Sequence, residues 1–196
     1  MTAIELGILD WIQTLHTPFL DAFMSNFTKL GDAGILWILL TLVLLLIPKT
    51  RKVGLVLMAA LLVDVILCNG ILKNLVARTR PFDVNTAISL LVARPRDFSF
   101  PSGHTAASFA SIAALYLVNK DHVRLGAPAR LTSVLWKAAL VAGCLLAFSR
   151  LYLYVHFPTD ILGGIAVGIL SGYLGYRIYA WLEARRKTQG GKTCYV

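Results

Sequence analysis

Long apolar segments separated by short polar stretches make up most of the chain. They cover roughly residues 33–47, 53–72, 105–118, 133–155 and 159–182. A helix needs about 20 apolar residues to cross a bilayer, within a range of about 17–25, and the second, fourth and fifth segments reach that length. The first reaches it only by including part of the preceding "FTKLGDAG", and the third only by beginning near Ser102 or Gly103. The pattern therefore predicts about five transmembrane helices.

Residues 3–30 follow a different pattern. Apolar residues recur there at helical spacing, at Ile4, Ile8, Trp11, Ile12 and Leu15. The acidic residues Glu5 and Asp10 lie between them. This spacing predicts an amphipathic helix that lies in the membrane interface, followed by a second piece after Pro18. The alternative is a sixth span, which is less favoured because the apolar run is interrupted by Asp10, His16, Asp21 and Lys29.

The composition agrees with an all-α integral membrane protein. Of the 196 residues, 57% are hydrophobic and 15% are charged, whereas a soluble domain is about half apolar and a quarter charged. The three cysteines, Cys68, Cys144 and Cys194, are far apart, so we expect no disulfide framework. The acidic N-terminal segment lacks the basic region of a signal peptide.

The net charge of +9 does not indicate nucleic-acid binding, because the basic residues are scattered between apolar segments. They serve instead to orient the spans by the positive-inside rule. The more basic side holds Lys49, Arg51, Lys52, Lys120, Arg124, Arg130, Arg185, Arg186, Lys187 and Lys192. We therefore expect a cytoplasmic C-terminus and, with five spans, an N-terminus outside.

Basic residues also cluster on the predicted outer side, within residues 73–96. Because cations on the outer side reduce the charge difference that orients the spans, we expect these residues to have a separate function. Cations gathered at a membrane surface suit an anionic group such as a lipid phosphate. Anchoring to lipid headgroups explains the same cluster equally well.

The first polar motif is "KNLVARTRP", residues 73–81, at the outer end of the second span. Lys73 and Arg80 fall near one face of a helix, which Pro81 is expected to end. An arginine fork beside a lysine point charge suits a phosphate. The alternative is a pair of long side chains that reach from a span end to the interface.

The second motif is "PSGH", residues 101–104. Ser102 is a favourable N-cap, and Gly103 permits close backbone approach. The unpaired N–H groups and the positive dipole end of a helix favour an anion, while His104 can exchange a proton near neutral pH. Taken alone, this motif is explained better by ordinary capping.

The third motif is "SRLYLYVHFPTD", residues 149–160. Arg150, His156 and Asp160 lie between the fourth and fifth spans. His156 and Asp160 are four residues apart, about one helical turn, and an aspartate at that distance fixes the tautomer of a histidine. A surface histidine in a loop and an ion-paired Asp160 that caps the helix are the alternatives.

The three motifs lie at different span ends, yet the predicted topology places all of them on the outer surface. Two histidines, a carboxylate, several cations and a helix N-terminus then converge. Phosphoryl transfer needs such a set, because it requires a nucleophile, an orienting group, a proton donor and a charge clamp.

The same residues resemble the motifs of the type 2 phosphatidic acid phosphatase family. The matching positions are Lys73 with Arg80-Pro81, then Pro101-Ser102-Gly103-His104, then Ser149-Arg150 with His156 and Asp160. The resemblance covers residues 73–160 in detail. It implies one membrane phosphatase domain over residues 1–196, with interfacial helices at 1–32, a transmembrane core at 33–182 and a cytoplasmic tail at 183–196.

The resemblance also implies a role for each matching residue. His156 resembles a nucleophile that forms a phosphohistidine, and Asp160 resembles its orienting partner. His104 resembles the general acid that protonates the leaving oxygen and then activates water. The groups that resemble phosphate ligands are Lys73, Arg80, Ser102, Gly103 and Arg150. The family needs neither a metal ion nor another cofactor.

The implied substrate is a lipid phosphate. A small chain with an outward-facing site favours undecaprenyl pyrophosphate in a bacterial inner membrane, with phosphatidic acid and phosphatidylglycerol phosphate as alternatives. A noncatalytic lipid carrier would not need both histidines, and a vanadium haloperoxidase would resemble a soluble protein. The sequence leaves a homo-oligomer open.

Two features of the spans lie outside the motifs. Asp64 is inside the second span, about 14 Å along a helix from Lys73, and we expect it to make a buried polar contact. Gly164, Gly168 and Gly172 repeat every four residues in the fifth span. This repeat predicts close helix packing, within the bundle or in a dimer.

Overall fold

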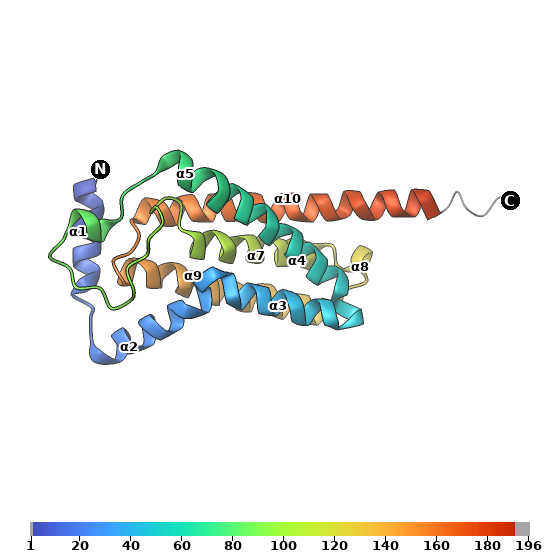
Figure 1. The fold of residues 1–196 in the computed structure, drawn as a ribbon. Coiled ribbons are helices and arrows are strands. Elements are labelled where there is room, and N and C mark those ends of the chain that lie inside the picture. The colour runs from blue at the N-terminus through green and yellow to red at the C-terminus, as the bar shows by residue number, and fades with distance from the viewer. Residues whose placement is uncertain (1, 191–196) are drawn as a thin grey trace.

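A computed structural model describes residues 2–190 of the chain, which leaves Lys192 and Cys194 outside the described residues. The secondary structure of the described part is helical, with a long loop at residues 85–102, and the helices form an elongated bundle (Figure 1). Its main helices are α1 (Thr2–Gln13), α2 (Pro18–Phe27), α3 (Ile35–Leu46), α4 (Arg51–Asp64), α7 (Gly103–Lys120), α9 (Ala129–Tyr152) and α10 (Pro158–Gly190). The shorter ones are η1 (Thr28–Gly34), η2 (Pro48–Thr50), η3 (Val65–Leu72), α5 (Lys73–Val76), α6 (Pro81–Val84) and α8 (His122–Leu125).

Four helical stretches are long and apolar enough to cross a membrane. They are Pro18–Leu46, Pro48–Val84, Ala129–Tyr152 and Pro158–Thr188. Helix α7, the remaining predicted span, packs against α4, α9 and α10, and small residues make up much of its buried surface. The predicted all-α membrane fold is thus confirmed, while the number of spans stays a prediction.

Helices α7 and α10 approach each other at the distance of direct backbone contact. A Cβ atom added to Gly168 would lie 2.4 Å from the carbonyl oxygen of Ala106, and one added to Gly172 would lie 2.6 Å from that of Ala110. Only glycine permits this approach. The predicted packing role of the glycine repeat is therefore confirmed, and the repeat serves the bundle.

The first predicted span gains its length from the segment before it. Helix α3 begins only at Ile35, and the chain bends just before it, where Ala33 and Gly34 adopt positive φ angles of 50° and 73°. The turn η1 and helix α2 continue the apolar stretch on the other side of this bend. The bend places the η1 backbone beside α7.

The predicted helix through the first motif is wrong. Helix α5 ends at Val76, Ala77 has a left-handed backbone with φ 46°, and Arg80 is extended. Pro81 begins the short helix α6. The reason is local: proline disfavours helical backbone in the residue before it and is well suited to the first position of a new helix.

Helix α1 crosses the end of the bundle (Figure 1). Its outward face carries the predicted apolar positions Ile4, Ile8 and Trp11, and Leu15 is exposed just beyond the end of the helix. Its inward face buries Glu5, Leu9 and Ile12. The helix and its exposed apolar face agree with the prediction, but Ile12 and the acidic Glu5 face the protein, and the place of the helix in the membrane interface stays a prediction.

Candidate active site

The three polar motifs meet at the end of the bundle that α1 crosses. Between them lies a polar cavity of about 600 Å³. Its wall includes Lys73, Arg80, Gly103, His104, Arg150 and His156. Ser102 and Asp160 are fully buried behind this wall. The structure thus brings together the side chains that the sequence selected from three separate span ends.

His156 lies just before α10 and is 2% exposed. Its Nε2 is 3.3 Å from Nη1 of Arg80, and its Nδ1 is 3.5 Å from Oδ2 of Asp160. Burial lowers the pKa of His156 to about 3, against the opposing effect of the Asp160 carboxylate, and the positive charge of Arg80 adds to the lowering. The imidazole is therefore neutral at physiological pH, as a nucleophile must be.

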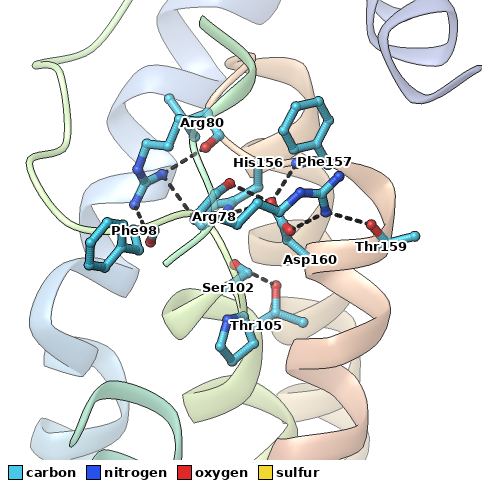
Figure 2. Close-up of polar contacts among 12 residues, drawn as sticks. Arg78, Arg80, Phe98, Ser102, Thr105, His156, Phe157, Thr159 and Asp160 are labelled. Carbon is cyan, nitrogen blue, oxygen red and sulfur yellow. Dashed lines mark hydrogen bonds and ion pairs between the residues drawn. The ribbon is translucent and has the colours of Figure 1, made fainter. Parts of the chain in front are cut away.

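Asp160 is held in the first turn of α10 by donors on both carboxylate oxygens. Its Oδ2 accepts hydrogen bonds from the Ser99 hydroxyl and from the backbone N–H of Phe157. Its Oδ1 accepts one of 2.6 Å from Nη1 of Arg78 (Figure 2). These bonds satisfy a buried carboxylate and fix its orientation toward His156.

Lys73 and Arg80 are joined by a carboxylate that sequence reasoning missed. Asp97 forms an ion pair with the Lys73 ammonium, and its Oδ1 accepts a 2.6 Å bond from Nη2 of Arg80. Burial acts to raise the pKa of Asp97, but the two cations outweigh it and hold the pKa at about 2. Asp97 is exposed on the cavity side and lies outside every motif, so the sequence offered no signal for it.

The turn η1 contacts the other side of the cavity. Oδ1 of Asp32 is 3.0 Å from Nε2 of His104, and a Cβ atom on Gly31 would lie 2.4 Å from that imidazole ring. Thr28 accepts a 2.6 Å hydrogen bond from Nη1 of Arg150. Sequence reasoning missed these contacts, although the polar "TKLGDAG" between apolar stretches was the available signal.

The start of α7 differs from the expected N-cap. Ser102 occupies the N-cap position, but its side chain makes no capping bond. Its hydroxyl accepts a 3.1 Å bond from Thr105 (Figure 2). Its N–H donates to the Asp160 carbonyl at 3.1 Å. Ser102 is thus the N-cap residue as predicted, but its fully buried hydroxyl lies against Thr105 and does not cap the helix. A Cβ atom on Gly103 would lie 3.7 Å from Nζ of Lys73, so this glycine keeps room beside the lysine.

Comparison with known proteins decides the family. The profile of the PAP2 superfamily matches residues 51–184. The chain belongs to the PAP2 superfamily. This assignment agrees with the resemblance found in the sequence, and it makes the chain a membrane phosphatase that hydrolyses phosphate esters or diphosphates.

PAP2 relatives of this chain carry different substrate names. The undecaprenyl-diphosphatase of Sulfolobus acidocaldarius is 30% identical over 81% of this chain and 70% of its own length. The lipid A 4'-phosphatase of Bacteroides thetaiotaomicron is 31% identical over 94% of this chain and 81% of its own. A crystal structure of a PAP2-type phosphatidylglycerolphosphate phosphatase from Bacillus subtilis has a TM-score of 0.70 and 28% identity, and the match covers 90% of this chain and 84% of that one.

An apolar groove of about 630 Å³ adjoins the PAP2 site. Side chains of α3 and α4 line it, including Ile38, Leu42, Leu45, Met58, Leu61 and Leu62. The groove and the polar cavity share Lys73, Asp97, Gly103 and His104 in their walls. The charged cavity and the apolar groove are therefore adjacent at these four residues.

Asp64 also lines the groove. It is 1% exposed, as expected of a residue inside a span. Its Oδ1 has no hydrogen-bond partner among residues 2–190, so the predicted buried polar contact is wrong for this atom. The reason is its position, because the neighbouring groove residues are mostly aliphatic.

Proposed function

We propose that this PAP2 phosphatase hydrolyses undecaprenyl diphosphate at the extracytoplasmic face of a bacterial cytoplasmic membrane, through a phosphohistidine on His156. The observation that carries the proposal is the junction of the polar cavity with the apolar groove at Lys73, Gly103 and His104. The cavity is charged and the groove is aliphatic, so the bond to be cleaved lies where they meet.

The first step transfers the phosphoryl group to His156. Nε2 attacks phosphorus, an N–P bond forms and the bond to the leaving oxygen breaks. The protonated imidazole of His104 gives its proton to that oxygen, and Asp32 holds this imidazole at 3.0 Å. Asp160 stabilises the positive charge that develops on the His156 ring.

The second step releases inorganic phosphate. His104, now neutral, takes a proton from a water molecule that attacks phosphorus, and the N–P bond to His156 breaks. Both transition states spread negative charge over the phosphoryl oxygens. Lys73, Arg80 and Arg150 are fixed cations at the cavity wall, and prearranged charges of this kind stabilise a transition state without reorganisation.

The groove supports a polyprenyl substrate. Its wall is mostly aliphatic and its volume is about 630 Å³, and we assign it to part of a single polyprenyl chain. The relative from Sulfolobus acidocaldarius, named as an undecaprenyl-diphosphatase, supports the same choice. Phosphatidylglycerol phosphate is the second candidate, favoured by the structural likeness to the Bacillus subtilis enzyme.

The distribution of basic residues supports the proposed orientation. At the end of the bundle away from the site, Glu183 of α10 pairs with Lys52 at 2.9 Å and with Arg124 at 3.1 Å. These cations belong to the more basic side, which the positive-inside rule makes cytoplasmic. The site then opens outward and α10 leads the C-terminus into the cytoplasm.

The test is a phosphate-release assay on the purified protein in detergent, with a chelator present. The panel contains undecaprenyl diphosphate, phosphatidylglycerol phosphate, phosphatidic acid and a soluble phosphate ester. We expect the highest kcat/KM for undecaprenyl diphosphate and no turnover by His156→Ala. Turnover by that variant at the wild-type rate would contradict the mechanism, and a preference for a glycerolipid would contradict the substrate.

A further inference from the structure

We propose that Glu5 and Arg78 are positioning residues for Asp160, so that helix α1 helps to set the reactivity of His156. The inference rests on the proposed function, because it concerns the partner of the proposed nucleophile. Neither residue belongs to the matched motif positions, although Arg78 lies between Lys73 and Arg80 in the chain.

Both terminal nitrogens of the Arg78 guanidinium are hydrogen-bonded behind the active site. Its Nη1 donates 2.6 Å hydrogen bonds to Oδ1 of Asp160 and to the Thr159 hydroxyl, and its Nη2 donates one of 2.7 Å to Oε2 of Glu5. Its Cζ also lies 4.0 Å from the centre of the Phe157 ring (Figure 2). Arg78 does not line the polar cavity. It is therefore placed to hold Asp160 and not to bind the substrate phosphate.

Glu5 ties this arginine to helix α1. Glu5 is 5% exposed, and its Oε1 accepts hydrogen bonds from both the backbone N–H and the hydroxyl of Thr159. A buried carboxylate is costly unless it is paired and hydrogen-bonded, and here every contact leads to Arg78 or to the first turn of α10. The position of α1 is thus coupled to the residue next to Asp160.

The charges along this chain of contacts explain why both residues are needed. When phosphorus bonds to Nε2, the His156 ring gains a positive charge. Asp160 stabilises it, but Arg78 at 2.6 Å offsets the charge of Asp160. Glu5 restores the balance, because Glu5, Arg78 and Asp160 together carry one net negative charge. Removing the charge of Glu5 leaves the group neutral and the phosphohistidine less stable.

The experiment compares Glu5→Gln and Arg78→Lys with Asp10→Asn as the matched control. Asp10 lies on the same helix and also contacts the loop before α10, through a 2.7 Å bond from the Tyr154 hydroxyl, but it does not touch Asp160. All three proteins are assayed in detergent on undecaprenyl diphosphate. We expect Glu5→Gln to lower kcat about tenfold, equal to about 1.4 kcal/mol in activation free energy. We expect KM within about twofold of wild type.

Arg78→Lys keeps the charge but loses the fork, since an ammonium is a compact point charge. We expect a larger loss of kcat than in Glu5→Gln, whereas Asp10→Asn keeps the wild-type kcat. A second readout needs no turnover. The ¹⁵N resonance of Nδ1 of His156 should shift in Glu5→Gln and Arg78→Lys but not in Asp10→Asn.

Wild-type kcat and an unchanged Nδ1 resonance in Glu5→Gln would overturn the inference. Equal losses in Glu5→Gln and Asp10→Asn would also overturn it, because they would show that α1 acts only as a structural attachment. Absence of phosphate release from the wild type on every lipid would instead contradict the proposed function. In that case the Nδ1 resonance alone decides whether Glu5 and Arg78 position the dyad.

Discussion

Replacing Gly168 with alanine tests whether the distance between α7 and α10 controls catalysis. The added Cβ atom would lie 2.4 Å from the Ala106 carbonyl oxygen and 2.8 Å from Cβ of Phe109. Ordinary contacts begin at 3.4 Å, so the helices must separate by about 1 Å. Overpacking of this kind costs about 1–3 kcal/mol. For a chain of this size, about 2 kcal/mol lowers Tm by roughly 4–8 °C.

The same separation disturbs the site. The 3.1 Å bond from the Ser102 N–H to the Asp160 carbonyl crosses from the start of α7 to the start of α10. His104 lies on the first of these helices, and His156 is two residues before the start of the second. A misplacement of about 1 Å between reacting groups reduces turnover by roughly 10²-fold. We therefore expect kcat of Gly168→Ala to fall by about that factor.

The assay combines thermal unfolding in detergent with phosphate release below the Tm of the variant. Gly7→Ala is the matched control, because its added Cβ atom has no neighbouring atom within 4 Å. We expect Gly7→Ala to keep wild-type activity and stability. Wild-type kcat in a folded Gly168→Ala protein would refute the idea that this helix contact sets the catalytic geometry.

Three further predictions concern the titratable groups of the site. Asp32→Asn removes the carboxylate beside His104, and kcat for undecaprenyl diphosphate should fall about tenfold, or about 1.4 kcal/mol; an unchanged kcat would exclude the pair from proton transfer. Asp97→Asn frees two cations from an internal anion, so the inhibition constant of inorganic phosphate should fall several-fold; weaker inhibition would show that Asp97 instead holds the cations in place. The pKa of His156 is lowered to about 3 in the folded protein, whereas an unfolded histidine titrates near 6.5. Below that pH the unfolded state binds a proton that the folded state does not, so stability is lost as the pH falls from about 6.5 towards 3. The Tm of wild type should therefore drop more between pH 7 and pH 5 than the Tm of His156→Gln, and equal drops would contradict this assignment.

The sequence predicted the parts of this molecule that depend on local spacing. Hydrophobic periodicity located the helices, and the order of the motifs placed Lys73, His104 and His156 at one end of the bundle. The helix through Arg80 was predicted wrongly because the preference of Pro81 for a helix start outweighed the continuation of the helix. The signal was present in the sequence, because proline both disfavours helical backbone in the residue before it and suits the first position of a new helix.

The partners of the site residues were not predictable in the same way. Glu5 meets Arg78 across 73 positions of the chain, and Asp32 meets His104 across 72. Hydrophobic periodicity does not reveal such a contact, because within its own segment each of these residues looks like any other polar residue. The acidic residue of an amphipathic helix is normally assigned to solvent, which is why the burial of Glu5 was not foreseen.

The backbone contact between α7 and α10 and the groove along α3 and α4 differ in how many substitutions they tolerate. Carbonyl oxygens face Gly164, Gly168 and Gly172, so no exchange of a neighbouring side chain can make room for a larger residue there. The groove along α3 and α4 is lined by side chains, and each single substitution reshapes it. Under the proposed function, substitutions in the groove can therefore change the lipid preference one residue at a time while the contact between α7 and α10 is kept.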